Sequence, residues 1–533
     1  MLPENPTSYE DLQERFKWQI PHVFNIGFAC SDAPAFKTPN KPAILDYSGD
    51  KPLKISFGAL AERSTKFAAA LSALGIKKGD RIAVMLPQCH EAVVAHLGIY
   101  KLGAIVVPLA MQFGPQALQH RLHTSSTKAF IGNQLSNARL SQIKNELPEL
   151  EINISIDHDD GLNFESLIEK ASTNFKIANT GPNDPAMMLF TSGTTGQPKG
   201  TLHGHRVLLG HLPGIQMAQG FMPKQGDIFW TPSDWAWAGG LLNALLPALY
   251  FGVTVVASRA PKFEPYWAMN LINKAKITNV FMPATAIKMM QSELEKTPNL
   301  ALRSLGTAGE ALGAQTLNWA EQALGLHINE FYGQTECNAI ISACKDIEVF
   351  KQGSMGKQVP GHQVSIVDET GTPLPAGQAG EIAVHKSSPV MFLKYWNAHK
   401  ATKEKFKGDW MLTGDLGSCD DEGYFHFLGR NDDIITSSGY RIGPSEIEDC
   451  LTSHPSVALT AVTGHPDPVR TQIICANIQL SKGISPSVEL EAEIRAYVKN
   501  KLSAHQYPRI INFVDHVPLT ESGKVIRRHF RDN

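Results

Sequence analysis

The pattern that most constrains the fold runs from Arg81 to Leu109. An apolar run, RIAVMLP, is followed by a helix-like segment, HEAVVAHLGIYKLG, and then by a second apolar run, AIVVPL. Both runs are continuously apolar rather than alternating, which is typical of parallel strands buried on both faces. The sequence therefore predicts a strand–helix–strand unit in a sheet that helices cover on both sides.

Further apolar runs of strand length recur through the first 430 residues. They are AFIGN at 129–133, INISI at 152–156, MMLF at 187–190, VTVVAS at 253–258, NVFMP at 279–283, SLGTAG at 304–309 and INEFYG at 328–333. Such repetition predicts the α/β fold class, with a large multilayered N-terminal domain over residues 1–430. Beyond Gly353 the strands alternate and turn signals separate them, which predicts a β-rich subdomain within that domain.

A polar stretch at 431–433, Asn-Asp-Asp, separates this region from a run of mixed elements. Helical patterns such as PSEIEDCLTSHP alternate there with strand patterns such as QIICANIQL. We therefore expect a hinge at 431–433 and a small α+β C-terminal domain over 434–533.

One uncharged stretch, Gly239–Ser258, has the roughly 20 residues that a membrane helix needs. Pro247 and Gly252 interrupt it, and its second half is β-branched. We predict a buried helix followed by a strand that begins near Val253, and no integral membrane segment.

The charge balance and the cysteines exclude several functions. Lys and Arg total 49 against 51 Asp and Glu, so no basic surplus indicates a nucleic-acid partner. Seven cysteines form no C-x-x-C pair, which favours a reduced chain without structural zinc. The acidic N-terminal segment is unlike a secretory signal, so we expect a cytoplasmic location.

The segment TSGTTGQPKG at 191–200 directly follows the predicted strand MMLF. Its glycines and hydroxyl side chains expose hydrogen-bond donors without steric bulk, which suits a polyphosphate better than a plain surface turn. The common nucleoside-triphosphatase loop is a different pattern, because Gly196 and Lys199 are here separated by two residues. The expected phosphate contacts are Thr191, Ser192, Gly193, Thr194, Thr195, Gly196 and Lys199.

This loop resembles the signature of the adenylate-forming superfamily, in which acyl-CoA synthetases are found. Further matching segments follow in the family's order: Ala308–Ala311, Tyr332–Glu336, Thr413–Asp415, Gly429–Asp433 and Ser522–Lys524. The resemblance implies an ATP- and Mg²⁺-dependent activation of a carboxylic acid to acyl-AMP, then transfer of the acyl group to CoA. The small-molecule partners are then the carboxylate, ATP and CoA.

The resemblance also implies roles for single residues. Glu336 is expected to bind Mg²⁺ and Thr335 to contact the α-phosphate. The adenine is expected between Gly309, Glu310 and Ala311 on one face and Tyr332 on the other, with Gln334 nearby. Asp415, in a turn, is expected to accept the ribose hydroxyls. Arg430 resembles the arginine that contacts ribose and phosphate, and Lys524 resembles the lysine that bridges the substrate carboxylate and the α-phosphate.

Asp432 matches the family's hinge, about which the mobile small domain turns between the two half-reactions. In the first state Lys524 closes the site, and in the second the segment Ser438, Gly439, Tyr440 and Arg441 is expected to face CoA. Both parts of this pattern are present in the sequence. The resemblance therefore implies domain alternation.

The acyl pocket is expected to include Trp235, Trp237, Ala238, Gly239, Ala308 and Gly333. Tryptophans are also ordinary core residues, so that role stays open for Trp235 and Trp237. Acetate-specific relatives have larger residues where this chain has Ala308 and Gly333, which favours a medium-chain fatty acid.

The alternatives are an aromatic or short branched acid, the loading of a carrier protein, or a silent nucleotide- or acyl-binding regulator. A homodimer and acylation of Lys524 also stay open.

Overall fold

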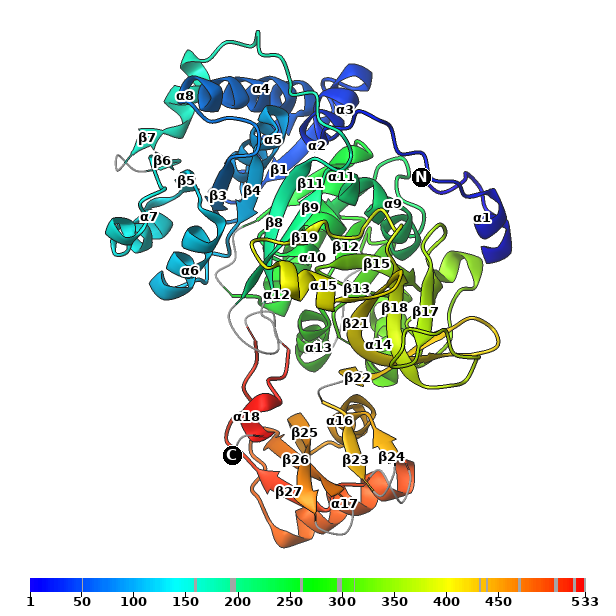
Figure 1. The fold of residues 1–533 in the computed structure, drawn as a ribbon. Helices are drawn as coiled ribbons and strands as arrows, with labels where there is room; N and C mark the ends of the chain where they lie inside the picture. The colour runs from blue at the N-terminus through cyan, green and yellow to red at the C-terminus, as the bar shows by residue number, and fades with distance from the viewer. Residues whose placement is uncertain are drawn as a thin grey trace.

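The chain is described by a computed structural model (Figure 1). It places all residues except 50, 158–160, 192–197, 259–261, 295–299, 311, 431–432, 438–439, 468–470, 503–506, 521–523 and 532–533. At residues 436, 440, 441 and 471 it describes the backbone alone.

An eight-stranded sheet contains the predicted strand–helix–strand unit. β3 (Arg81–Met85) and β4 (Ile105–Pro108) are parallel, and α5 (His90–Leu102) connects them, as predicted. Gly103 ends α5 with a φ of 75°, a conformation that glycine adopts without steric cost. The sheet order is β19 (Lys394–Tyr395), β9 (Lys199–Gly204), β8 (Pro185–Thr191), β4, β3, β5 (Ala129–Gly132), β6 (Ile152–Ser155) and β7 (Leu162–Asn163).

A nine-stranded sheet carries most of the other predicted strands. Its order is β16 (Lys357–Gln358), β15 (Cys337–Ser342), β14 (Ile328–Gln334), β13 (Ser304–Ala308), β12 (Asn279–Phe281), β10 (Ile228–Trp230), β11 (Thr254–Ala257), β1 (Pro42–Asp46) and β2 (Leu53–Ser56). The pairs from β1 to β14 are parallel, whereas β15 turns back antiparallel to β14. Ligand sites of parallel sheets lie at the carboxyl ends of the strands, so a ligand site is expected at the ends of β13 and β14.

Helices pack between and around these two sheets. They are α1 (Tyr9–Arg15), α2 (Ile26–Cys30), α3 (Asp32–Lys37), α4 (Phe57–Ala73), α6 (Pro115–Ser125), α7 (Gln134–Ser141), α8 (Phe164–Lys170), α9 (Arg206–Ala218), α12 (Pro265–Lys274), α13 (Ala284–Glu293) and α14 (Ala314–Leu324). One apolar cluster joins Ile82 and Met187 of the first sheet, through Val93 of α5 and Leu208 of α9, to Val255 of the second. The layered α/β prediction is therefore confirmed.

The expected β-rich subdomain is also present. It is a five-stranded sheet of β17 (Val364–Val367), β18 (Gly380–His385), β20 (Phe406–Lys407), β21 (Trp410–Cys419) and β22 (Phe425–Arg430), with α15 (His399–Glu404) beside it. β21 pairs antiparallel with both β18 and β22.

The C-terminal elements form a separate lobe, drawn in orange and red in Figure 1. The sheet contains β23 (Ile435–Ser437), β24 (Tyr440–Ile442), β25 (Val457–Asp467), β26 (Thr471–Leu480) and β27 (Ile510–Phe513), together with α16 (Pro444–Thr452), α17 (Val488–Lys501) and α18 (Arg528–Arg531). Ser487 caps α17 by accepting the N–H of Leu490, and acidic residues in the first turn complement the helix dipole. The mixed α+β composition predicted for this region is confirmed.

The uncharged stretch forms short helical segments and a strand. α10 (Ala238–Gly240), a π-helical turn (Leu241–Leu245) and α11 (Leu246–Tyr250) precede β11, which begins one residue after the predicted start. Within the described part of the chain, no helix has both the length and the apolar character needed to cross a bilayer.

Candidate active site

Side chains of the matched segments, which are far apart in the sequence, meet beyond the ends of β13 and β14. The Tyr332 hydroxyl donates to Oδ2 of Asp415 at 2.5 Å, and the Arg430 guanidinium donates to Oδ1 at 3.0 Å. Asp415 is buried, and burial raises its pKa, while the charge of Arg430 acts in the opposite direction. The carboxylate is therefore held between a phenol and a guanidinium, in a fixed orientation.

The expectation that Asp415 lies in a turn is wrong. Asp415 lies within β21, directly opposite Arg430 of β22 in the antiparallel ladder. Thr413 and Gly414 resemble a turn sequence, and Gly414 does have a φ of 79°. The strand nevertheless continues because β18 and β22 pair with it on either side.

Lys524 reaches this site from the C-terminal lobe. Its Nζ lies 4.0 Å from the position that a Cβ on Gly309 would occupy. Its charge lowers the pKa values of both Glu310 and Asp415, against the larger effect of burial, which raises them. The structure therefore brings Lys524 together with Gly309, Glu310 and Asp415.

Thr335 and Glu336 form the turn between β14 and β15. Glu336 is buried, and its side chain accepts a short hydrogen bond from the Tyr395 hydroxyl of β19. Burial, followed by the charge of Glu336, raises the pKa of Tyr395, so the phenol stays protonated and donates. Gln334 donates to the Thr413 carbonyl at 3.0 Å, which ties this turn to β21.

The ends of the predicted phosphate loop are placed beside this turn. Thr191 ends β8 and Lys199 begins β9, and the two residues are paired in the antiparallel ladder. The Lys199 Nζ lies 5.5 Å from the centre of the Tyr395 ring. The remaining loop residues, Ser192, Gly193, Thr194, Thr195 and Gly196, lie outside the described residues, as do Ala311, Asp432, Ser438 and Gly439. Tyr440 and Arg441 are placed only as the backbone of β24.

The two tryptophans of the predicted acyl pocket pack into different apolar clusters. Trp235 is buried in the apolar cluster that joins the two large sheets, here called the main apolar cluster. Ala238 and Ala308 pack against this cluster. Trp237 packs edge-on against Phe113, with the ring centres 5.7 Å apart.

Gly333 has no space for a side chain. A Cβ there would lie 2.5 Å from the Cα of Asn338, closer than such atoms approach in proteins. A Cβ on Gly239 would lie 2.9 Å from the Phe281 ring. The assignment of Gly333 to the acyl pocket stays a prediction. On this backbone, a larger side chain at position 333 would clash with Asn338 rather than fill empty space.

Sequence reasoning missed two buried side chains next to the turn. They are Tyr395, which contacts Glu336, and His203 of β9, which lies against the backbone of Thr335. Burial lowers the pKa of His203 to about 3, so the imidazole is neutral. No sequence motif marks either residue. Tyr395 and Glu336 are far apart in the chain, so no spacing pattern in the sequence connects them.

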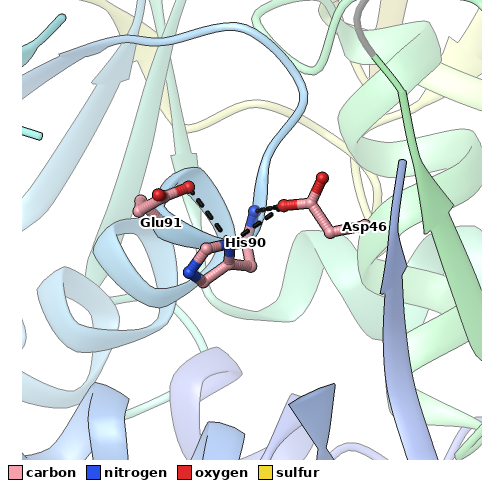
Figure 2. A group of neighbouring side chains, drawn as sticks. All are labelled: Asp46, His90 and Glu91. Carbon is pink, nitrogen blue, oxygen red and sulfur yellow. Dashed lines mark hydrogen bonds and ion pairs between the residues drawn. The ribbon is translucent and has the colours of Figure 1, made fainter. Parts of the chain in front are cut away.

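A second group of titratable side chains lies at the start of α5 (Figure 2). Asp46 accepts the backbone N–H of His90 at 2.8 Å and faces its Nδ1 at 2.9 Å, while Glu91 approaches the same nitrogen at 3.2 Å. The spacing of these atoms would suit a metal ion. The hydrogen bonds already explain the arrangement, however, since Asp46 caps the helix.

Comparisons with known proteins identify the family of the chain. The AMP-binding enzyme family matches residues 32–396, more than half of the chain, and the AMP-binding enzyme C-terminal domain matches residues 446–524. An uncharacterised acyl-CoA ligase of Bacillus subtilis, YtcI, is 36% identical over 497 residues, which cover 92% of this chain and 93% of that protein. The mitochondrial acyl-coenzyme A synthetase ACSM2B of Homo sapiens is 35% identical over 535 residues, with coverages of 96% and 91%.

Solved structures share the fold over nearly the whole chain. The anthranilate CoA ligase AuaEII, solved with anthranoyl-AMP, has a TM-score of 0.87 at 26% identity, covering 96% of this chain and 98% of that one. A benzoate CoA ligase from Burkholderia xenovorans has a TM-score of 0.85 at 26% identity, with coverages of 96% and 100%. The chain therefore belongs to the AMP-binding enzyme family, which confirms its resemblance to the adenylate-forming enzymes.

Proposed function

We propose that this protein is an AMP-forming acyl-CoA synthetase. It activates a carboxylic acid with ATP to acyl-AMP and pyrophosphate, then transfers the acyl group to CoA and releases AMP. The observation that carries the proposal is the meeting of Asp415, Arg430, Glu336 and Lys524, from separate parts of the chain, around the end of β14. Each of these side chains supplies a charge that an adenylating site requires.

The proposed roles follow from position and charge. Asp415 accepts hydrogen bonds from the ribose hydroxyls, since Tyr332 and Arg430 fix the orientation of its carboxylate. Lys524 neutralises the charge that develops on the α-phosphate, and Thr335 with Lys199 contacts the phosphates. Arg430 contacts the ribose and the α-phosphate.

A buried carboxylate at the turn suits a magnesium ion, because Mg²⁺ prefers oxygen ligands. Glu336 is such a group, since it is buried beside the ends of the phosphate loop. When bound, Mg²⁺ would supply charge neutralisation to the triphosphate.

Domain alternation is part of the proposal. The large domain would span 1–430, the hinge 431–433 and the small domain 434–533. The contact of Lys524 with Gly309 supports this proposal, because the state that forms acyl-AMP would need the lysine at this site. Rotation about Asp432 would then withdraw Lys524 and bring Ser438, Gly439, Tyr440 and Arg441 toward CoA.

The favoured substrate is a medium-chain fatty acid, because Ala308, where acetate-specific relatives have a larger residue, packs as a small side chain against the main apolar cluster. An aromatic acid is the second candidate, favoured by the structural neighbours described as anthranilate and benzoate CoA ligases.

A screen of AMP release with CoA tests both substrates. It uses acetate, butyrate, hexanoate, octanoate, benzoate and phenylacetate. Release that is highest with hexanoate or octanoate supports the first candidate, and release that is highest with benzoate or phenylacetate supports the second. Pyrophosphate exchange without thioester formation would instead indicate a carrier-protein substrate, and the absence of both reactions with every acid would overturn the proposal.

Three further expectations stay predictions: a cytoplasmic location, a homodimer and acylation of Lys524. Acylation would remove the charge of Lys524 and so inhibit the first half-reaction. Mass spectrometry of the native protein that never finds modified Lys524 would remove the support for this regulation.

A further inference from the structure

The backbone of the Thr335–Glu336 turn is held independently of its side chains. The Phe392 N–H donates to the Glu336 carbonyl at 2.9 Å, and His203 lies against the Thr335 backbone. The Gln334 side chain bonds to Thr413 on the neighbouring strand. The position of the Glu336 backbone therefore does not depend on the Tyr395 hydroxyl.

The Glu336 carboxylate, in contrast, depends on Tyr395. Among the described residues, the Tyr395 hydroxyl is the hydrogen-bond donor that the structure gives to this carboxylate, and it bonds to Oε1. A glutamate side chain has three rotatable bonds, so a single fixed donor restricts its orientation considerably.

Tyr395 is itself rigidly placed. Its backbone N–H donates to the Thr402 hydroxyl at 3.0 Å, and its Cα pairs with Thr201 in the ladder between β19 and β9. The ring is buried against Phe392, with the ring centres 4.9 Å apart. Because β9 begins at Lys199, the strand pair also sets the distance between Lys199 and Glu336.

We propose that Tyr395 is a positioning residue, whose hydroxyl holds the Glu336 carboxylate in the orientation that binds the magnesium ion of Mg²⁺·ATP. The inference rests on the proposed function, because that function assigns Glu336 to the metal. With Oε1 bonded to Tyr395, the other carboxylate oxygen would be available to bind the ion. Tyr395 would act through its hydrogen bond to Glu336.

The expected effect is specific to the metal. Groups that orient metal ligands through hydrogen bonds typically contribute 10- to 100-fold to metal affinity. Tyr395→Phe removes the hydroxyl and keeps the buried ring, so the packing with Phe392 should persist. The variant should need about 10- to 100-fold more Mg²⁺ for half-maximal adenylation, with an unchanged KM for the acid.

The test compares Tyr395→Phe with two other variants of the full-length protein. Glu336→Gln removes a ligand charge and sets the size of the effect when the metal contact itself is lost. Tyr424→Phe is the matched control, because Tyr424 is also buried and donates to a backbone carbonyl, that of Glu348 at 3.4 Å, away from the site.

Two readouts separate positioning from a general structural role. The first is Mn²⁺ binding in the presence of α,β-methylene-ATP, followed by electron paramagnetic resonance without turnover. The second is thioester formation from supplied acyl-AMP and CoA, which should be unchanged in Tyr395→Phe. The proposal predicts weaker Mn²⁺ binding in Tyr395→Phe and Glu336→Gln and wild-type binding in Tyr424→Phe.

The outcomes distinguish this inference from the proposed function. Wild-type Mn²⁺ binding by Tyr395→Phe, with weakened binding by Glu336→Gln, would overturn the positioning role and leave the function intact. Unchanged binding in both would overturn the assignment of Glu336 to the metal. A lowered melting temperature with equal losses in both half-reactions would show that the Tyr395 hydroxyl supports the fold instead.

Discussion

The side chain of Lys524 lies against Gly309, with its Cε 3.7 Å from the position that a Cβ on Gly309 would take. The two residues belong to the C-terminal lobe and to the end of β13, respectively. Gly309 has a φ of 100°, a conformation that other residues rarely adopt. The backbone at the end of β13 therefore leaves space that the lysine side chain occupies.

Lys524→Ala should lose acyl-AMP formation by about 10²- to 10³-fold, the size of effect seen when one donor to a transition state is removed. Thioester formation from supplied acyl-AMP should be retained, because the proposed domain rotation would withdraw the lysine in that step. Each half-reaction is measured separately, with Lys482→Ala as a control for an exposed lysine of the same lobe. Parallel loss of both half-reactions would contradict domain alternation.

Asp432→Pro should show the opposite behaviour. Proline fixes φ near −65° and should stiffen the hinge, so CoA transfer should slow while adenylation persists if the locked geometry is the first state. Pyrophosphate exchange and thioester formation are the two measurements. A variant in which both reactions survive unchanged would show that the chain does not turn at Asp432.

Ala308→Val should shift the chain-length preference toward shorter acids. Ala308 packs against the main apolar cluster, and each methylene that no longer fits loses about 0.8 kcal/mol, or roughly fourfold in kcat/KM. The ratio of kcat/KM for octanoate to that for butyrate measures this effect. If the ratio did not change, Ala308 would not line the pocket.

Gly333→Ala is the contrasting variant. Its Cβ would meet the backbone of Asn338, and overpacking of this kind typically costs about 1–3 kcal/mol of stability. We expect a lower melting temperature and similar losses for every acid. A selective loss for long acids, with no loss of stability, would instead place Gly333 on the pocket wall.

Asp46→Asn should destabilise the protein by about 2 kcal/mol at pH 7. Hydrogen bonds from His90 and Ser48 lower the pKa of Asp46 to about 2, against the effect of burial. A carboxyl whose pKa is lowered in the folded state stabilises the protein above its unfolded pKa, near 3.8, and this contribution is lost as the pH falls through about 2.

Denaturant unfolding of wild type and variant at pH 7 and pH 3 tests this dependence. The difference in unfolding free energy should fall to roughly half at pH 3. A difference that is the same at both pH values would mean that the ionised form of Asp46 is not what stabilises the start of α5.

The sequence alone determined most of the secondary-structure elements and the residues that are candidates for nucleotide binding. Continuous apolar runs predicted β3, β4 and the other parallel strands, because a strand that is buried on both faces consists mostly of apolar residues. The matched segments likewise predicted which residues would serve the nucleotide, and the structure brings Tyr332, Asp415 and Arg430 together.

Only the tertiary structure decided how these elements pair. A turn-like Thr413-Gly414 pair became part of a strand because β18 and β22 hydrogen-bond to β21 on both sides. Tyr395 meets Glu336 because β19 pairs with β9, nearly 200 residues earlier in the chain. Residue patterns record whether a segment is buried, whereas strand pairing and side-chain contacts depend on distant segments competing for the same hydrogen bonds and space.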